Sequence, residues 1–156
     1  MKTRNTLLLL LFLAVIAVLA NESIQEQAAE SGANWLTDFE AAQSKAAAEN
    51  KTMLLDFTGS DWCIWCIRLK DEVFTQQAFV DYAGEKLVLV RIDFPKKQTQ
   101  PDALKKQNAS LAEKYGIRGF PTVVLLSPVG ELIETTGYRR GGPESYVAHL
   151  RDLLAE

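Results

Sequence analysis

Short apolar segments alternate with segments of helical pattern along most of this chain, and that alternation restricts it to an α/β fold. Four segments are rich in leucine and β-branched residues and are bounded by turn residues, at 53–57, 87–93, 122–126 and 131–135. Runs of this kind are typical of buried strands. A short Pro-Val-Gly turn separates the last two, so we expect them to form a hairpin. Because helical segments separate the others, the predicted order is β-α-β-α-β-β-α in one domain.

Helix signals occupy the segments between and around these strands. Thr37 followed three residues later by Glu40 fits a capping box, so we expect an additional helix ahead of the first strand, to about Asn50. Residues 94–107 contain two prolines and four lysines. This composition predicts an insertion at the surface, whose lysines face the solvent. The alternative is that the lysines dock a partner. Further helices are expected at 63–72, about 76–83, about 103–115 and from Gly141 to about Leu154.

The first 20 residues (1–20) have the organisation of a secretory signal peptide. Two basic residues precede an uninterrupted apolar run over 7–20, which is short for the roughly 20 residues that span a bilayer and has the length of a signal-peptide core. Cleavage is expected after Ala20, with an uncleaved anchor as the alternative. A flexible lead-in at 21–33 then precedes a domain over 34–156. We therefore expect a periplasmic or secreted protein, with no stable membrane span after cleavage.

The composition excludes several functional classes. The 156-residue chain has one His and two Cys, which cannot supply the four ligands of a structural zinc site. Two Cys also exclude a small fold held together by several disulfides. The net charge of −3 argues against a protein that follows nucleic-acid phosphates. We therefore expect no metal, no cofactor and no nucleic acid, and the two cysteines become the main candidates for chemistry.

The cysteines form the motif Cys63-Ile64-Trp65-Cys66 between the first predicted strand and the helix that follows it. A helix N-terminus favours an anion, so a thiolate at Cys63 is stabilised and its pKa is expected below the free value of ~8.5. Residues three apart lie on one helix face, close enough for their sulfurs to form a disulfide. Cys63 would attack a substrate disulfide and Cys66 would resolve the mixed disulfide. Half of a metal site and a static disulfide are the alternatives.

Two separated motifs resemble those of the thioredoxin family. Residues 54–66, with the sequence LLDFTGSDWCIWC, are similar to the active-site segment of thioredoxins. Residues 115–122, with the sequence YGIRGFPT, are similar to the loop that carries the family's cis-proline. The resemblance extends over about 35–154 and is strongest to exported bacterial thioredoxin-like proteins. It implies a thioredoxin fold, with a central mixed four-stranded sheet flanked by helices and, here, an extra N-terminal helix.

The resemblance also implies roles for individual residues around the cysteines. Pro121, preceded by Phe120, would be cis and would face the cysteines, and the backbone beside it would pair with an extended substrate. Trp62 would form part of the docking surface, with ordinary packing against the helix as the alternative. Trp65 lies between the cysteines and would shape access to Cys63.

The sequence departs from the family pattern at the acid beneath the cysteine pair. Asp56 resembles that buried acid, whose raised pKa would let it accept the proton of Cys66. Thioredoxins usually place the acid six residues before the first Cys, whereas Asp56 is seven before Cys63. If the extra residue lies in the turn at Gly59, Asp56 faces inward; if it lies in the strand, Asp56 points elsewhere. Asp61 is a weaker candidate for the acid, with capping of the helix as its alternative.

A second departure concerns the direction of electron flow. Strongly oxidising relatives carry a His just before the second Cys, whereas Trp65 stands at that position and supplies no charge. We therefore expect an exported thiol-disulfide oxidoreductase that acts through Cys63 and Cys66 and reduces protein disulfides. It would act as a monomer with an unidentified redox partner. A disulfide oxidase or isomerase, a binding or assembly module without turnover, and a metallochaperone are the alternatives.

Overall fold

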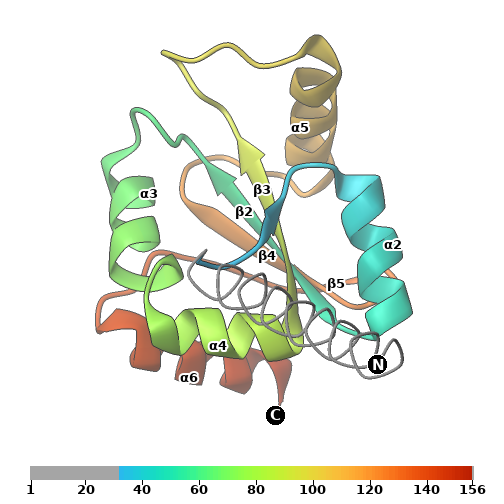
Figure 1. Ribbon diagram of the computed structural model, residues 1–156. Coiled ribbons are helices and arrows are strands. Elements are labelled where there is room, and N and C mark those ends of the chain that lie inside the picture. Colours follow the sequence, from blue (N-terminus) through green and yellow to red (C-terminus); the bar gives the residue numbers. More distant parts are fainter. Residues whose placement is uncertain (1–31, 156) are drawn as a thin grey trace, which may run out of the picture. The chain divides into compact units, whose positions relative to one another are not determined.

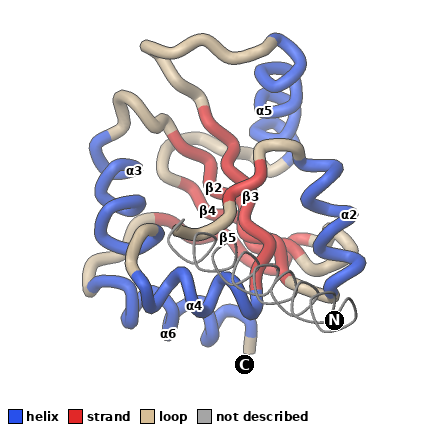
Figure 2. Tube along the Cα trace, viewed as in Figure 1, coloured by secondary structure: helices blue, strands red, loops and turns tan. Residues whose placement is uncertain are grey.

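The computed structural model describes residues 32–155, which form one mixed sheet with helices on both of its faces (Figure 1, Figure 2). The predicted signal peptide (1–20) and nearly all of the predicted lead-in (21–33) lie outside the described residues. The α/β class and the predicted order of elements are confirmed. In chain order the elements are β1 (Trp35–Leu36), α2 (Phe39–Glu49), β2 (Thr52–Thr58), α3 (Ile64–Leu69), the π-helical turn η1 (Lys70–Phe74), α4 (Gln77–Lys86), β3 (Leu87–Asp93), α5 (Asp102–Lys114), β4 (Thr122–Leu126), β5 (Leu132–Gly137) and α6 (Gly142–Leu154).

Strand β2 lies at the centre of the sheet, whose order is β1-β3-β2-β4-β5. It pairs in parallel with β3, from Thr52 opposite Leu87 to Thr58 opposite Asp93, and antiparallel with β4 on its other edge. A strand with neighbours on both edges and helices over both faces has no solvent side, so its residues are buried in succession rather than in alternation. This explains the unbroken burial from residue 53 to residue 58.

The sheet has five strands rather than the four expected. The additional strand, β1, consists of Trp35 and Leu36, which pair in parallel with Leu89 and Val90 of β3. A two-residue strand is too short to show the apolar run or the alternation by which strands are predicted from sequence. Its pairing covers part of the outer edge of β3, whose backbone groups would otherwise lie unpaired there.

The ends of two helices differ from those predicted. Helix α2 is capped by Asp38, whose Oδ1 accepts a hydrogen bond from the Ala41 N–H at 3.0 Å. The predicted capping box of Thr37 and Glu40 is therefore wrong by one residue, because Asp38 also has a capping side chain and takes the extended backbone of a cap. After the cysteines, α3 continues directly into η1 and ends at Phe74, beyond the predicted end. Among the described residues, no helix combines the length and the apolar character needed to cross a bilayer.

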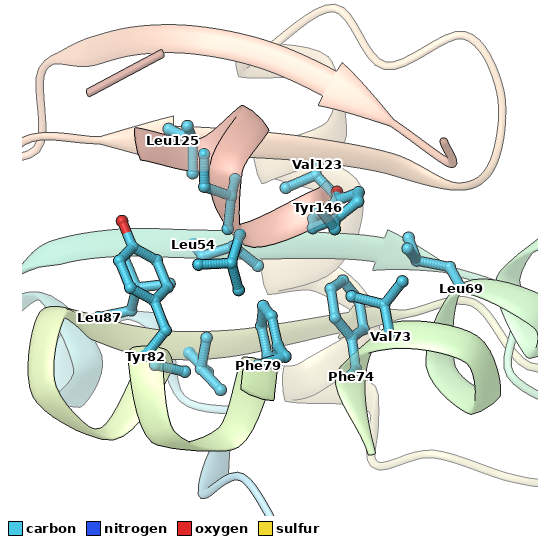
Figure 3. Close-up of a cluster of buried hydrophobic side chains, with 14 residues drawn as sticks. Leu54, Leu69, Val73, Phe74, Phe79, Tyr82, Leu87, Val123, Leu125 and Tyr146 are labelled. Atoms are coloured by element: carbon cyan, nitrogen blue, oxygen red, sulfur yellow. The ribbon is translucent and has the colours of Figure 1, made fainter. Parts of the chain in front are cut away.

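A hydrophobic cluster covers each face of the sheet. One cluster joins the sheet to α3, η1, α4 and α6, and Figure 3 shows Phe74, Phe79 and Tyr146 gathered beside Leu54 of β2. The ring centroid of Phe74 lies 4.8 Å from that of Phe79 and 6.0 Å from that of Tyr146. The other cluster joins the opposite face to α2 and α5. Because successive side chains of a strand point to opposite faces, the residues of β2 that share the side of Leu54 face the helix that carries the cysteines.

We expect Leu54→Ala to lower the free energy of unfolding by about 2–5 kcal/mol, since it removes a fully buried side chain and leaves a cavity. Denaturation with urea, followed by far-ultraviolet circular dichroism, measures the loss. Leu132→Ala is the matched control because Leu132 of β5 is 57% exposed, and it should change the same quantity by less than about 0.5 kcal/mol. Equal losses in the two variants would contradict the central position assigned to Leu54.

Candidate active site

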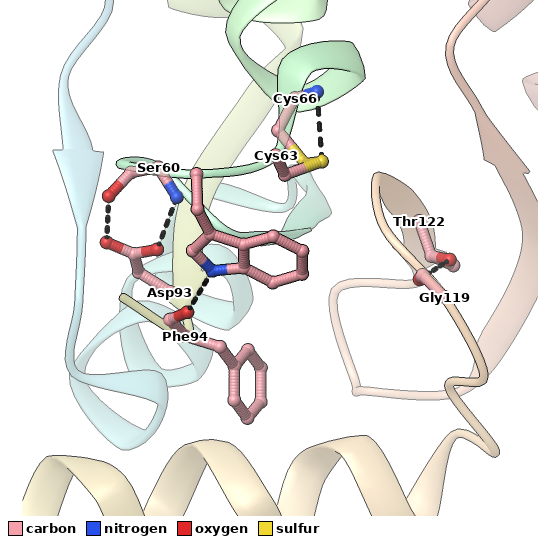
Figure 4. The surroundings of a disulfide bond; sticks show 8 residues. Ser60, Cys63, Cys66, Asp93, Phe94, Gly119 and Thr122 are labelled. Atoms are coloured by element: carbon pink, nitrogen blue, oxygen red, sulfur yellow. Dashed lines mark hydrogen bonds between the residues drawn. A yellow bond between two sulfur atoms is a disulfide. The ribbon is translucent and has the colours of Figure 1, made fainter. Parts of the chain in front are cut away.

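The two cysteines lie at the carboxyl end of β2, where the chain turns into α3. They are bonded to each other, with their Cα atoms 5.2 Å apart (Figure 4). Cys63 is the N-cap of α3, and its Sγ accepts a hydrogen bond from the Cys66 N–H at 3.2 Å. The predicted position of the motif at the start of a helix is confirmed. An N–H directed at Sγ, at the positive end of a helix, favours negative charge on Cys63 in the reduced pair.

The turn that leads into the motif depends on Gly59. Its carbonyl oxygen accepts hydrogen bonds from the backbone N–H groups of Trp62, at 3.2 Å, and Cys63, at 2.8 Å. A Cβ atom at this position would lie only 2.5 Å from Cε2 of Trp62. Glycine therefore lets the indole lie directly against the backbone. The turn fixes the position of the thiol and of the indole beside it at the same time.

Asp56 faces the cysteine side of the sheet because β2 runs without a bulge to its end. Asp56 lies opposite Arg91 of β3 and Val123 of β4 in an unbroken register, two residues after Leu54 and therefore on the same face. The extra residue relative to thioredoxins thus lies in the turn after the strand, which leaves Asp56 facing inward. The carboxyl group borders a cavity of about 100 Å³, which is lined by Asp56, Thr58, Ser60, Cys66, Ile67, Lys70, Phe74 and Arg91.

Burial controls the ionisation of Asp56. Desolvation raises the pKa of its carboxyl group from 3.8 to about 7; the charge of Arg91 lowers this pKa and the charge of Asp93 raises it. Its Oδ1 accepts no hydrogen bond from any of the described residues. A carboxyl group that titrates near neutral pH in the cavity it shares with Cys66 can accept a proton there and return it.

The Phe120–Pro121 peptide bond is cis, as the resemblance implied. The hydroxyl of Thr122 donates a hydrogen bond to the carbonyl oxygen of Gly119 at 2.8 Å, across the proline, and Figure 4 shows this turn in the surroundings of the disulfide. The ring of Phe120 meets the indole of Trp62 edge to face, with centroids 6.0 Å apart. The structure therefore brings the cis-proline loop into contact with the residue that precedes Cys63.

Trp62 and Trp65 are both partly exposed, with 38% and 43% of their surface accessible. Trp62 packs and yet remains accessible, so the packing and docking roles considered for it are compatible. The ring of Trp65 lies 5.2 Å from that of Tyr138 and 5.0 Å from the guanidinium of Arg68. The hydroxyl of Tyr138 donates to Glu72 at 2.6 Å. The indole between the cysteines is thus contacted by Arg68 of its own helix and by Tyr138, which follows β5 and is itself held by Glu72.

The sequence did not predict the part that the end of β3 and the residues after it play around the motif. Asp93 accepts hydrogen bonds from the backbone N–H of Ser60 at 2.9 Å and from its hydroxyl at 2.6 Å, and the ring of Phe94 stacks on Phe120 at 5.1 Å. Asp61 is neither the buried acid nor the helix cap, since its carboxylate binds backbone amides of the predicted insertion. The carboxyl ends of neighbouring parallel strands lie at one edge of a sheet, and this rule could have placed the insertion beside the motif.

Comparison with known proteins assigns this geometry to a family. A family model for thioredoxin-like domains matches residues 39–153. The chain belongs to the thioredoxin-like family. It is 33% identical over 137 residues to the disulfide bond reductase DsbH of Chlamydia pneumoniae, a match that covers 86% of this chain and 82% of that relative.

A second relative and a solved structure extend the comparison. The thioredoxin-related protein DsbJ of Chlamydia pneumoniae is 28% identical over 127 residues, which cover 77% of this chain but only 36% of DsbJ. A solved structure described as DsbH oxidoreductase superposes with a TM-score of 0.76 at 32% identity, covering 80% of this chain and 86% of that one. Together with the Cys63–Cys66 disulfide, these relatives identify a thiol-disulfide oxidoreductase of thioredoxin fold, as predicted.

We expect Asp56→Asn to stabilise the oxidised protein above neutral pH. Between pH ~4 and pH 7 the folded chain binds more protons at Asp56 than the unfolded chain does, so this group lowers the free energy of unfolding as the pH rises through that window. At pH 8 the variant should exceed the wild type by a few kcal/mol, on the order of the shift in pKa, and the difference should shrink towards pH 4. Urea denaturation at a series of pH values measures it.

Asp71→Asn is the control for this experiment, because Asp71 lies exposed on η1 and undergoes the same chemical change. Its curve of stability against pH should run parallel to that of the wild type. A parallel curve for Asp56→Asn as well would show that Asp56 does not titrate near neutral pH.

Proposed function

We propose that this protein reduces protein disulfides outside the cytoplasm. The observation that carries the proposal is the Cys63–Cys66 pair at the start of α3, with the uncharged Trp65 rather than a basic side chain before Cys66. A cation next to the thiolate stabilises the reduced pair and makes a strong oxidant. With an uncharged neighbour in that position, the dithiol gives up its electrons more readily. DsbH of Chlamydia pneumoniae, described as a disulfide bond reductase, supports the same direction.

The proposed reaction passes two electrons from the cysteine pair to the substrate. The Cys63 thiolate attacks one sulfur of the substrate disulfide, which forms a mixed disulfide and releases the other substrate sulfur as a thiolate. Cys66 then gives its proton to Asp56 and attacks Sγ of Cys63, which releases the second substrate sulfur and forms the Cys63–Cys66 disulfide. A pKa of about 7 for Asp56 suits this transfer. A separate redox partner returns the pair to the dithiol.

Apolar side chains that are at least partly exposed around the disulfide form the proposed docking surface. Trp62 and Phe120 contact each other on one side of the pair, and Trp65 is partly exposed between the two cysteines. The backbone beside the cis Pro121 would pair with an extended segment of the substrate. The apolar leader predicted for residues 1–20 would bring this domain, acting as a monomer, into an oxidising compartment where disulfides form.

We expect a reduction potential for the Cys63–Cys66 pair near the roughly −270 mV of thioredoxin. Equilibration of the purified protein with glutathione or dithiothreitol buffers, followed by alkylation of the free thiols, measures it. A value near roughly −120 mV would contradict the proposed direction and support a disulfide oxidase instead.

We expect Cys63→Ser to abolish the acceleration of insulin reduction by dithiothreitol, leaving only the uncatalysed rate, because it removes the attacking sulfur. Cys66→Ala should instead accumulate mixed disulfides, since the attack succeeds and the resolving step is lost. Turbidity of insulin and non-reducing electrophoresis report the two results. His149→Ala, on α6, is the control variant and should retain the activity of the wild type. Full activity of Cys63→Ser would contradict the assigned role of Cys63.

A further inference from the structure

Asp61 connects the cysteine motif to residues 94–98, which we call the 94–98 segment. Its carboxylate accepts hydrogen bonds from the backbone N–H groups of three successive residues, Lys96 at 2.9 Å, Lys97 at 2.7 Å and Gln98 at 3.1 Å. The bond from the Lys96 amide is the main cause that holds the pKa of Asp61 below its usual value. The carboxylate is therefore charged, and these bonds are formed, at neutral pH.

The 94–98 segment contacts both aromatic rings beside the proposed docking site. The Nε1–H of Trp62 donates a hydrogen bond to the carbonyl oxygen of Phe94 at 2.8 Å, which Figure 4 shows. The ammonium group of Lys96 lies 3.7 Å from the centroid of the Trp62 ring. The ring of Phe94 stacks on that of Phe120. One short segment therefore holds the indole by its polar edge and by its face, and supports the second ring.

The bonds to Asp61 restrain the 94–98 segment at the point where sheet pairing ends. The Phe94 N–H still donates to the carbonyl oxygen of Thr58 at 2.9 Å, one residue beyond β3. Residues 95–101 then form neither helix nor strand. Three successive amides directed at one carboxylate fix backbone dihedrals that sheet hydrogen bonds no longer fix. Removing the carboxylate would let the Phe94 carbonyl and the Lys96 side chain move away from Trp62.

We propose that Asp61 is a positioning residue for substrate docking. By fastening the 94–98 segment, it holds Trp62 and Phe120 in the orientation that receives the polypeptide around a substrate disulfide. This inference rests on the proposed reduction of protein disulfides and adds a residue that controls it. The effect of Asp61 should therefore differ between protein disulfides and small disulfides. A protein disulfide must lie against the two rings before Cys63 attacks it, whereas a small disulfide reaches Cys63 without them.

The test compares the attack of Cys63 on two disulfides in a Cys66→Ala parent, in which the mixed disulfide accumulates. Insulin supplies the protein disulfide, and bis(2-hydroxyethyl) disulfide is a small, uncharged one. Asp61→Asn keeps the size of the side chain but replaces one acceptor oxygen with an amino group that cannot accept the amide hydrogens. Asp152→Asn, on the exposed surface of α6, makes the same change elsewhere.

We expect Asp61→Asn to lower the rate constant for attack on insulin by about tenfold, and to change that for the small disulfide by less than about twofold. Asp152→Asn should leave both rate constants at the values of the parent. Hydrogen exchange at the amides of Lys96, Lys97 and Gln98 should accelerate in Asp61→Asn, which checks that the 94–98 segment is released.

Unchanged rate constants with both disulfides in Asp61→Asn would overturn this inference alone. Equal losses with both would also overturn it, because they would show that Asp61 acts on Cys63 or on the fold rather than on docking. A parent that reacts with the small disulfide but never with insulin would overturn the proposed function, and this inference with it.

Discussion

The hydrogen bonding of β2 on both of its edges is the constraint on which the site depends. Its register is continuous with β3 from Thr52 to Thr58 and with β4 from Met53 to Phe57. A slip of one residue would exchange the side chains on its two faces, so that Leu54 and Asp56 would move to the side of α2 and α5. The pairing that places Leu54 in the core therefore also places an acid on the side of the disulfide. One register of β2 therefore sets both the packing of the core and the position of the acid.

Removal from water both raises the pKa of the Asp56 carboxyl group and makes its burial unfavourable to folding. A charged group removed from water, with one oxygen that accepts no hydrogen bond from the described residues, opposes folding. Apolar burial in the clusters on both faces of the sheet offsets that cost. The removal from water also brings the pKa of the acid close to that of a reactive thiol, which an exposed carboxyl group would not reach.

Features encoded by local patterns were predictable from the sequence, and those that depend on register were not. The four longer strands follow from their apolar runs, and the place of Cys63 follows from the turn between a strand and a helix. The two-residue strand β1 has no local pattern, because it exists only through its pairing with β3. The orientation of Asp56 stayed open because the sequence does not show whether a strand or a turn carries an extra residue.

Ser60 contacts Asp93 at the end of β3, and Asp61 contacts residues that follow it. These contacts join positions more than thirty residues apart, and only the sheet places them side by side. This division has an evolutionary consequence. The cysteine pair lies at the start of α3, whereas part of what surrounds it belongs to the connection between β3 and α5. Such connections tolerate insertions and substitutions that strands and helices do not. A lineage could therefore alter which proteins it recognises by changing this connection, while the electron chemistry of the cysteine pair is inherited unchanged.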